Sequence, residues 1–252
     1  MKIPICGKGG CGKSTLTTLL ANSYAKDEKR VLVIDGDESN FGLAQLLGKE
    51  QPKEYIDEMG GKMNMMPALA NAPMSIPNFF EKPWTMDTLP EGASPAPGEA
   101  KVMSIGKIHT DNEGCACIFN AVLMQLIDNL HLNKNDVTLI DMEAGIEHFG
   151  RGTDNAVDAV IMVIDPTAES IKLTNKVNEI TQHMGKPLRY VLNKVEPGDA
   201  NIIREQLDKP EFIIAEISSN KDIRKAGFDG SQLTLQLDET TLIKNELAKI
   251  QN

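Results

Sequence analysis

A glycine-rich segment near the start of the chain constrains the fold more than any other feature. It follows the short apolar run at residues 3–6 and reads Gly7-Lys8-Gly9-Gly10-Cys11-Gly12-Lys13-Ser14-Thr15. From Gly7 to Ser14 it fits the P-loop pattern G-x-x-x-x-G-K-[ST], in which a strand leads through a tight turn into a helix. The segment therefore predicts a strand, loop and helix unit that binds a nucleotide.

The residues of this loop have separate expected roles. Backbone N–H groups and the start of a helix near Lys13 form a cradle for phosphates. Lys13 is expected to reach the β- and γ-phosphates, and the Ser14 hydroxyl to ligate Mg²⁺. The predicted nucleotide-binding residues of the loop are Gly9, Gly10, Cys11, Gly12, Lys13, Ser14 and Thr15. A glycine-rich turn that binds nothing is the alternative, which the order of strand, loop and Leu-rich helix disfavours.

The lysine directly after the first glycine narrows the class. The pattern K-G-G-x-G-K-[ST], from Lys8 to Ser14, resembles the deviant Walker A loop of the MinD/ParA/nitrogenase-iron-protein class of ATPases. This resemblance implies a homodimer that holds ATP between its subunits, with Lys8 reaching the phosphates bound by the partner. A cation supplied in trans neutralises charge on the transferring phosphoryl group, so hydrolysis is expected to need the dimer. Without the resemblance, Lys8 reads as a solvated loop lysine.

Composition limits the remaining classes. At 252 residues and 41% hydrophobic, the chain can bury the core of one α/β domain. The net charge of −10 argues against sequence-independent DNA binding, which needs a basic face. No apolar run approaches membrane-spanning length, and the sequence opens into a strand without a secretory signal pattern. We therefore expect a cytoplasmic protein that binds neither nucleic acid nor membrane.

Apolar strand-like runs alternate with helical patterns along the chain. The expected strands cover 3–6, 31–34, 136–141, 159–164, 188–192 and 212–217, and the expected helices cover 14–26, 175–183 and 200–207. This alternation predicts a doubly wound, mostly parallel sheet of the α/β P-loop NTPase kind, in a single domain over 1–252. Pro4 conflicts with a central first strand because proline cannot donate to a ladder. The tail at 240–252 has helical apolar spacing with few cations, which favours a docked helix over a membrane anchor.

The segment from residue 60 to residue 100 has a different composition. It holds seven prolines and five methionines without a clear period. We expect an irregular insertion within the domain, with a short strand near residues 63–66. Its methionines are expected to fill gaps under the loop rather than to bind a soft metal.

Carboxylates follow two of the predicted strands. Asp35-Gly36-Asp37 ends the second strand, where the ATPases it resembles place switch I. There, Asp37 is the candidate for positioning the attacking water and Asp35 for orienting the loop. Asp141 ends a later apolar strand as in Walker B and is expected to act through a metal-bound water. The predicted catalytic residues are Lys8, Lys13, Asp37 and Asp141.

Three further positions complete the predicted nucleotide site. Gly145, in Glu143-Ala144-Gly145, is a switch II candidate whose N–H could reach the γ-phosphate. Asn193-Lys194 resembles the adenine-contacting pair of this class and favours ATP over GTP, since an amide both donates and accepts hydrogen bonds. His148 is expected to be a surface or packed histidine rather than a ligand.

The four cysteines fall into two groups. Cys6 and Cys11 are expected to pack as small side chains. Cys115 and Cys117 form a C-x-C motif at a helix start, where thiol pKa values fall, but two thiolates are too few for a closed tetrahedral site. A two-fold dimer axis beside the motif would bring four together and hold Ni²⁺ or Zn²⁺. The alternative is a structural pair of cysteines.

Several motifs together resemble a narrower family. They are residues 8–13, Gly-Cys-x-Cys at 114–117, and the stretches 143–148 and 151–153. This combination is similar to the CooC-type nickel-insertion ATPases, which mature carbon monoxide dehydrogenase. The resemblance implies an ATP-dependent metallochaperone whose client is apo carbon monoxide dehydrogenase or acetyl-CoA synthase. The alternatives are an iron-sulfur electron-transfer ATPase of the nitrogenase iron-protein kind and a MinD/ParA-like positioning ATPase.

Overall fold

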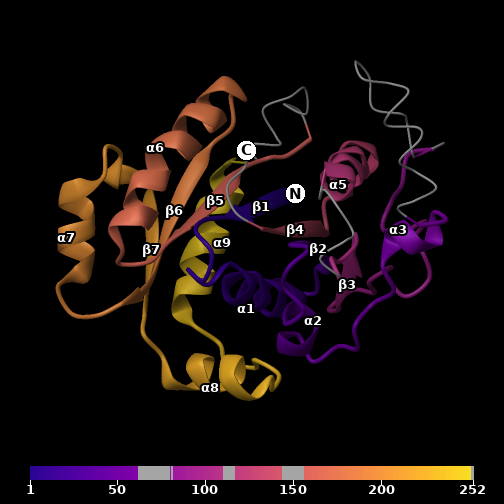
Figure 1. Ribbon diagram of the computed structural model, residues 1–252, viewed down its shortest axis with the longest axis horizontal. Helices are drawn as coiled ribbons and strands as arrows, with labels where there is room; N and C mark the ends of the chain where they lie inside the picture. The colour runs from indigo at the N-terminus through magenta and orange to yellow at the C-terminus, as the bar shows by residue number, and fades with distance from the viewer. Residues whose placement is uncertain (62–79, 81, 110–116, 144–155, 251–252) are drawn as a thin grey trace.

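Parallel strands form one sheet at the centre of the molecule (Figure 1). The computed structural model describes residues 1–61, 80, 82–109, 117–143 and 156–250. Within them the strands are β1 (Lys2–Cys6), β2 (Arg30–Gly36), β3 (Ala100–Ser104), β4 (Asp136–Met142), β5 (Val160–Ile164), β6 (Leu188–Val195) and β7 (Ile213–Ser218). Their order is β3-β2-β4-β1-β5-β6-β7, and every neighbouring pair is parallel. The predicted single-domain α/β fold is confirmed.

Helices cover both faces of the sheet (Figure 1). They are α1 (Lys13–Lys26), α2 (Leu43–Leu46), α3 (Tyr55–Glu58), α5 (Cys117–Asn129), α6 (Ala168–His183), α7 (Asp199–Gln206), α8 (Lys221–Asp229) and α9 (Asp238–Ile250). Alternate strand residues point to opposite cores. Leu32 and Ile34 pack with α5 and α6, whereas Val31 and Val33 pack with α1 and α9. Burial on both faces explains why the strands read as continuous apolar runs.

The six strands predicted from apolar runs are all present, and within the described residues β3 is the strand that sequence reasoning missed. It is a five-residue edge strand that carries Lys101 and Ser104 and directly follows the proline-rich segment, so its apolar signal is short. Helix α6 begins at Ala168, seven residues before the predicted start, because the Thr167 side chain accepts a hydrogen bond from the Ser170 N–H and caps it. Helix α8 was also not predicted.

Pro4 lies in the central strand without breaking the sheet. The ladder between β1 and β5 begins at Ile5, one residue after the proline. Before it, Lys2 pairs with Asp158 instead: its N–H donates to the carboxylate at 2.7 Å and its carbonyl accepts from the Asp158 N–H at 3.0 Å. The missing donor of Pro4 therefore lies just before the ladder with β5 begins, while Pro4 stays in register with Ile140 of β4 on the other side.

The C-terminal helix docks as predicted. Ile243 and Leu247 of α9 are fully buried against the core that α1 also covers. Lys244 pairs with Asp27 at the end of α1 at 2.6 Å. No helix in the described part of the chain has the length and apolar character of a bilayer span.

Of the predicted insertion at 60–100, residues 62–79 and 81 lie outside the described residues, including the strand expected near 63–66. Residues 82–99 consist of turns and irregular backbone that lead into β3. Among the methionines of this segment, Met86 is fully buried in the core beneath it.

Candidate functional site

The described site residues gather at one edge of the sheet. The P-loop follows β1, Asp37 follows β2, Asp141 lies near the end of β4, and Asn193 lies near the end of β6. Because the strands are parallel, all these ends meet at the same edge. Strand β1 lies between β4 and β5, where the chain connections diverge to the two sides of the sheet. Ligands of open α/β sheets bind at such a point.

Two glycines give the P-loop its shape. Gly7 has φ +141° and Gly12 has φ +105°, values that residues with side chains rarely adopt. A Cβ atom at Gly7 would lie 2.4 Å from the Val163 carbonyl oxygen, and one at Gly12 would lie 2.1 Å from Asn193 Nδ2. Helix α1 then begins at Lys13, so its free N-terminal N–H groups adjoin the loop. This is the backbone geometry that a phosphate cradle requires.

Side chains from β6 brace the loop. Asn193 Nδ2 donates to the Cys11 carbonyl at 2.8 Å, and Lys194 Nζ donates to the Gly10 carbonyl at 2.6 Å. Lys194 itself has φ +60°, a left-handed conformation that is uncommon for lysine. The pair predicted to contact adenine is thus attached to the P-loop backbone, and the Asn193 side chain is buried beneath it.

The two loop lysines lie in different surroundings. Lys13 is buried, with its Nζ 3.4 Å from the Lys8 carbonyl. Lys8 Nζ lies 3.6 Å from Asp165 Oδ2, just after β5, and 3.9 Å from Glu169 Oε2 in the first turn of α6. In this arrangement Lys8 pairs with carboxylates of its own chain.

A hydroxyl and a carboxylate meet beside the loop. Ser14 Oγ donates to Asp141 Oδ2 at 2.5 Å and accepts from Asn40 Nδ2 at 2.7 Å. The other Asp141 oxygen, Oδ1, is buried and has no hydrogen-bond partner among the described residues. Burial raises the pKa of Asp141 to about 7, against the opposing effect of the Ser14 hydrogen bond. A serine hydroxyl next to a carboxylate with a free buried oxygen suits an incoming Mg²⁺.

Loop 37–42, between β2 and α2, is held by a buried lysine that sequence reasoning missed. Lys107, just after β3, donates to Asp35 Oδ2 at 2.7 Å, to the Asp37 carbonyl at 2.5 Å and to the Asn40 carbonyl. Its Nζ also lies 5.5 Å from the centre of the Phe41 ring. A single cation thereby fixes the loop that carries Asp37. A lone lysine among apolar residues in a short run was the available signal for it.

The carboxylates of this loop are unequal. Asp37 Oδ1 accepts from both the N–H and the hydroxyl of Ser39, at 3.0 and 2.7 Å. Burial raises the pKa of Asp35 to about 6, although Lys107 opposes the shift. Burial, with a smaller effect from the neighbouring Glu143, also raises the pKa of Glu38 to about 7. Glu38 was not predicted, and its contact with Glu143 joins the segments that follow β2 and β4.

Several predicted residues lie outside the described part of the chain. They are Gly145, His148 and Cys115. Cys117 begins α5. The two other cysteines, Cys6 and Cys11, are buried as predicted, and burial raises the pKa of Cys11 to about 11. A reactive thiolate at Cys11 is therefore disfavoured.

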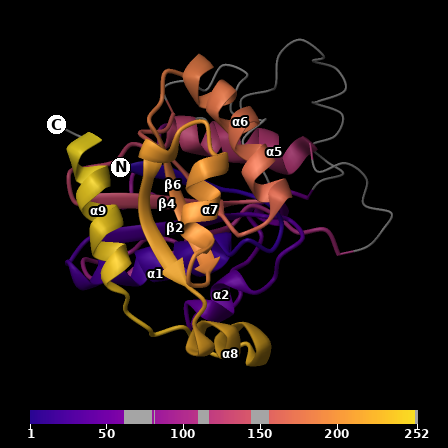
Figure 2. The same ribbon diagram turned by 90° about the vertical axis from the view of Figure 1, so that its left-hand side faces the viewer.

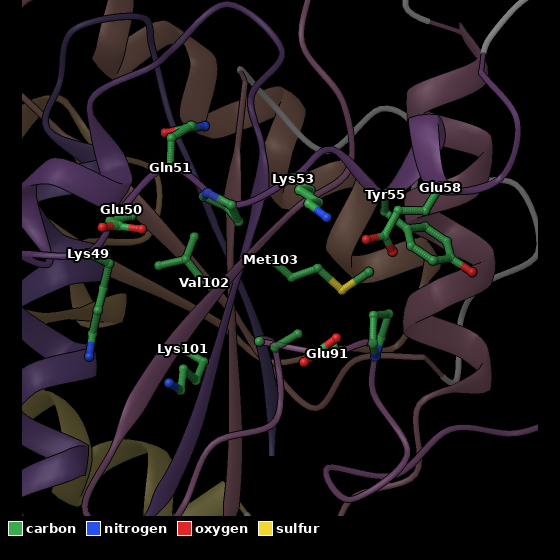
Figure 3. A pocket seen from close by; sticks show the side chains of 14 residues that line it. Lys49, Glu50, Gln51, Lys53, Tyr55, Glu58, Glu91, Lys101, Val102 and Met103 are labelled. Atoms are coloured by element: carbon green, nitrogen blue, oxygen red, sulfur yellow. The ribbon is translucent and has the colours of Figure 1, made fainter.

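A separate hollow lies beside the edge strand (Figure 3). It encloses about 640 Å³ between β3, the segment 49–58 and the segment 90–93. Lysines and glutamates both line it, and Lys49 and Lys101 already pair with Glu99, at 3.9 and 2.8 Å. This mixed and partly neutralised lining does not favour a particular ligand charge.

Comparison with known proteins agrees with this geometry. Residues 4–233 match the CobQ/CobB/MinD/ParA nucleotide binding domain family. The chain belongs to this family. An ATP-binding protein of Methanocaldococcus jannaschii is 43% identical over 99% of this chain and 100% of its own length. The carbon monoxide dehydrogenase accessory protein CooC of Rhodospirillum rubrum is 32% identical over 84% of this chain and 82% of its own length.

Solved structures of the family share the fold. The septum site-determining protein MinD of Pyrococcus horikoshii, complexed with Mg-ADP, superposes with a TM-score of 0.64 at 19% identity. The match covers 99% of this chain and 95% of that chain. The resemblance to the MinD/ParA class is thus confirmed, and the protein is an ATP-binding member of a P-loop ATPase family.

Proposed function

We propose that this protein is an ATP-dependent metallochaperone that inserts nickel into carbon monoxide dehydrogenase or acetyl-CoA synthase. One observation carries the proposal: the Cys115 and Cys117 motif occurs in a chain that is 32% identical to a carbon monoxide dehydrogenase accessory protein. Thiolates are soft ligands that suit nickel and zinc. Two per chain become four when two chains meet on a two-fold axis.

The nucleotide site would control this dimerisation. Lys13 would bind the β- and γ-phosphates, Ser14 and Asp141 would hold Mg²⁺, and Asp37 would orient the attacking water. Lys8 would leave Asp165 and Glu169 and reach the phosphates bound by the partner. ATP binding then favours the homodimer and the four-thiolate site. Hydrolysis removes the γ-phosphate, separates the thiolate pairs and releases the metal to the apo-enzyme.

Anaerobic metal binding tests the thiolate site. With ATP present, the protein should bind one nickel or zinc ion per two chains, and Cys115→Ala or Cys117→Ala should each lose most of the affinity. Cys6→Ala, which removes a buried thiol from β1, is the matched control and should bind normally. Metal binding that is unchanged after both motif cysteines are replaced would contradict the proposal.

The role of Lys8 is tested separately from the metal. Lys8→Ala should bind ATP but lose hydrolysis and ATP-driven dimerisation, as measured by phosphate release and sedimentation. Lys172→Ala, on the exposed side of α6, serves as the control. Full ATPase activity in Lys8→Ala would falsify the sandwich-dimer arrangement while leaving the metal site open to its own test.

A positioning ATPase of the MinD kind is the second candidate, favoured by the shared fold with MinD of Pyrococcus horikoshii. It predicts ATP-dependent binding to anionic vesicles or to duplex DNA. The net charge of −10 opposes both. Vesicle flotation and fluorescence anisotropy with ATP would distinguish the candidates, since the metallochaperone should bind neither probe. An iron-sulfur protein would instead be brown when purified without oxygen.

A further inference from the structure

The outer side of α8 presents an unusual set of side chains. Lys221, Arg224, Lys225 and Phe228 are all exposed, and their spacing places them on one side of the helix. Phe228 is 95% exposed, compared with 56% for Ile202, the next most exposed large hydrophobic residue in the described part of the chain. Single exposed hydrophobic residues are common. An aromatic ring surrounded by three cations on one helix face is a more specific combination.

The helix is firmly attached by its other side, so the exposure of Phe228 does not come from a frayed end. Ile223 and Ala226 pack against Leu19 of α1 and Leu233. The Asn220 side chain caps the N-terminus by accepting from the N–H groups of Asp222 and Ile223. Gly230 ends the helix with φ +68°. Figures 1 and 2 both show α8 at the periphery of the molecule, next to α1 and α2.

The charge of this face is opposite to that of the whole protein. The chain carries a net charge of −10, yet the outer side of α8 carries three cations. Within the described residues none of the three forms an ion pair, although Asp222 and Asp229 lie on the flanks of the same helix. Hydrogen bonds from Ser231 lower the pKa of Asp229, and Lys225 adds a smaller electrostatic effect. The cations are therefore available to carboxylates from outside the chain. Arginine and aromatic residues are also the types enriched at the centres of protein interfaces.

We propose that the Lys221, Arg224, Lys225 and Phe228 face of α8 docks an acidic segment of a partner protein. Carboxylates of the segment pair with the cations, and an apolar side chain of the same segment covers the Phe228 ring. The aromatic contact supplies most of the affinity, and the charges increase the association rate and select acidic partners. A phosphate backbone or an anionic bilayer fits less well, because each would bring extended negative charge close to an acidic molecule.

A displayed peptide library tests the chemistry directly. Random peptides would be selected on the full-length protein and counter-selected on Arg224→Glu. We expect the enriched sequences to place Asp or Glu beside a large apolar residue. Binding of one such synthetic peptide, followed by fluorescence anisotropy, should weaken about tenfold or more in Phe228→Ala and in Arg224→Glu. It should also weaken as salt is added.

Two matched variants complete the test. Leu242→Ala removes another exposed apolar side chain, on α9. Lys134→Glu, in the loop before β4, replaces an exposed cation with a carboxylate, as Arg224→Glu does on α8. Both should bind the peptide within about twofold of the unchanged protein. Thermal unfolding of Phe228→Ala should be unaltered, because its ring is almost fully exposed.

Other outcomes would overturn the proposal. Enriched peptides without acidic residues, or binding that Phe228→Ala leaves intact, would remove its basis. If the same substitutions instead abolish ATP-dependent self-association in sedimentation, the face belongs to the interface between two copies of this chain. If they abolish binding to phosphatidylserine vesicles or to duplex DNA, its occupant is a lipid or nucleic-acid phosphate.

Discussion

The two loops that meet at Ser14, the P-loop at residues 7–15 and loop 37–42, keep their shapes by different means. The P-loop is shaped by its own glycines, and Asn193 and Lys194 only support its carbonyl groups from outside. Loop 37–42 has the opposite arrangement. Its conformation depends on Lys107, which lies 72 residues beyond Asp35 in sequence and donates to oxygens at three separate positions.

The conformation of the P-loop is thus determined by residues within it, and that of loop 37–42 by a residue distant in sequence. A loop fixed by glycines survives the loss of any one supporting side chain, because the backbone geometry is set by its own residues. A loop fixed by one buried cation loses its conformation when the cation is removed, and the removal leaves an unpaired buried carboxylate. The P-loop can thus remain rigid while loop 37–42 changes its contacts.

The largest effect on ligand binding should come from removing the P-loop cation without altering the loop's shape. Lys13→Ala should weaken ATP binding about a hundredfold, because it deletes a charged contact to two phosphates. The fold should persist, since among the described residues the one hydrogen bond of Lys13 Nζ is long, 3.4 Å to the Lys8 carbonyl. Isothermal titration with ATP and Mg²⁺ measures the first effect and thermal unfolding the second. Tight ATP binding by Lys13→Ala would contradict the assigned role of the P-loop.

The largest effect on stability should come from the other loop. Lys107→Met should lower the free energy of unfolding by about 3–5 kcal/mol, because Asp35 remains buried without its partner. ATP hydrolysis should fall with it, while Asp35→Asn added to Lys107→Met should recover much of the stability. Lys101→Met, on β3 but partly exposed, is the control and should have little effect. The free energies of unfolding of the unchanged protein, the two lysine variants and the double variant are measured with denaturant. Equal losses of stability in Lys107→Met and Lys101→Met would contradict the role assigned to Lys107.

A smaller effect is expected where the P-loop is only supported. Asn193→Ala removes one hydrogen bond to the Cys11 carbonyl and should cost about 1–2 kcal/mol of stability. ATP affinity should fall only several-fold, because the glycines still shape the loop. Lys194→Ala, at the exposed neighbouring position, should cost less. Complete loss of nucleotide binding in Asn193→Ala would show that the hydrogen bond from Asn193, and not the glycines, determines the conformation of the P-loop.

The last effect concerns pH. Burial raises the pKa of Asp35 from 3.8 to about 6, so the folded protein retains a proton that the unfolded chain releases in this range. The stability of the protein without nucleotide should therefore fall as the pH rises from about 4 to about 6. Asp35→Asn should make that part of the profile less steep, with Asp141 and Glu38 still contributing because their pKa values are also raised. Asp57→Asn, exposed on α3, should leave the slope unchanged. Thermal unfolding measured over this pH range tests the prediction. If the stability of Asp35→Asn fell as steeply with pH as that of the unchanged protein, the raised pKa of Asp35 would be refuted.

The same division explains what could be predicted from sequence. The P-loop and Asp141 could be predicted because their signals are short: glycines at fixed spacing, and a carboxylate at the end of an apolar strand. Lys107 and Glu38 could not. The apolar residues around Lys107 hint at its burial, but nothing near either residue identifies the distant carboxylate that it contacts. Strand β3 was not predicted, because a five-residue edge strand that follows a proline-rich segment has little apolar signal. The metal site proposed for Cys115 and Cys117 depends on symmetry between two chains, which the sequence of one chain does not contain.

The central position of β1 has a consequence for biosynthesis. This strand is translated before the other strands of the sheet, and its two neighbours follow much later: Lys2 aligns with Thr138 of β4, and Ile5 with Ile161 of β5. A nascent chain that ends before β4 therefore holds the P-loop sequence with no strand on either side of it. Such long-range pairing makes closure of the sheet a late and slow step. The P-loop precedes β4, β5 and β6 in the sequence, so the nucleotide site is completed only after these strands have been translated.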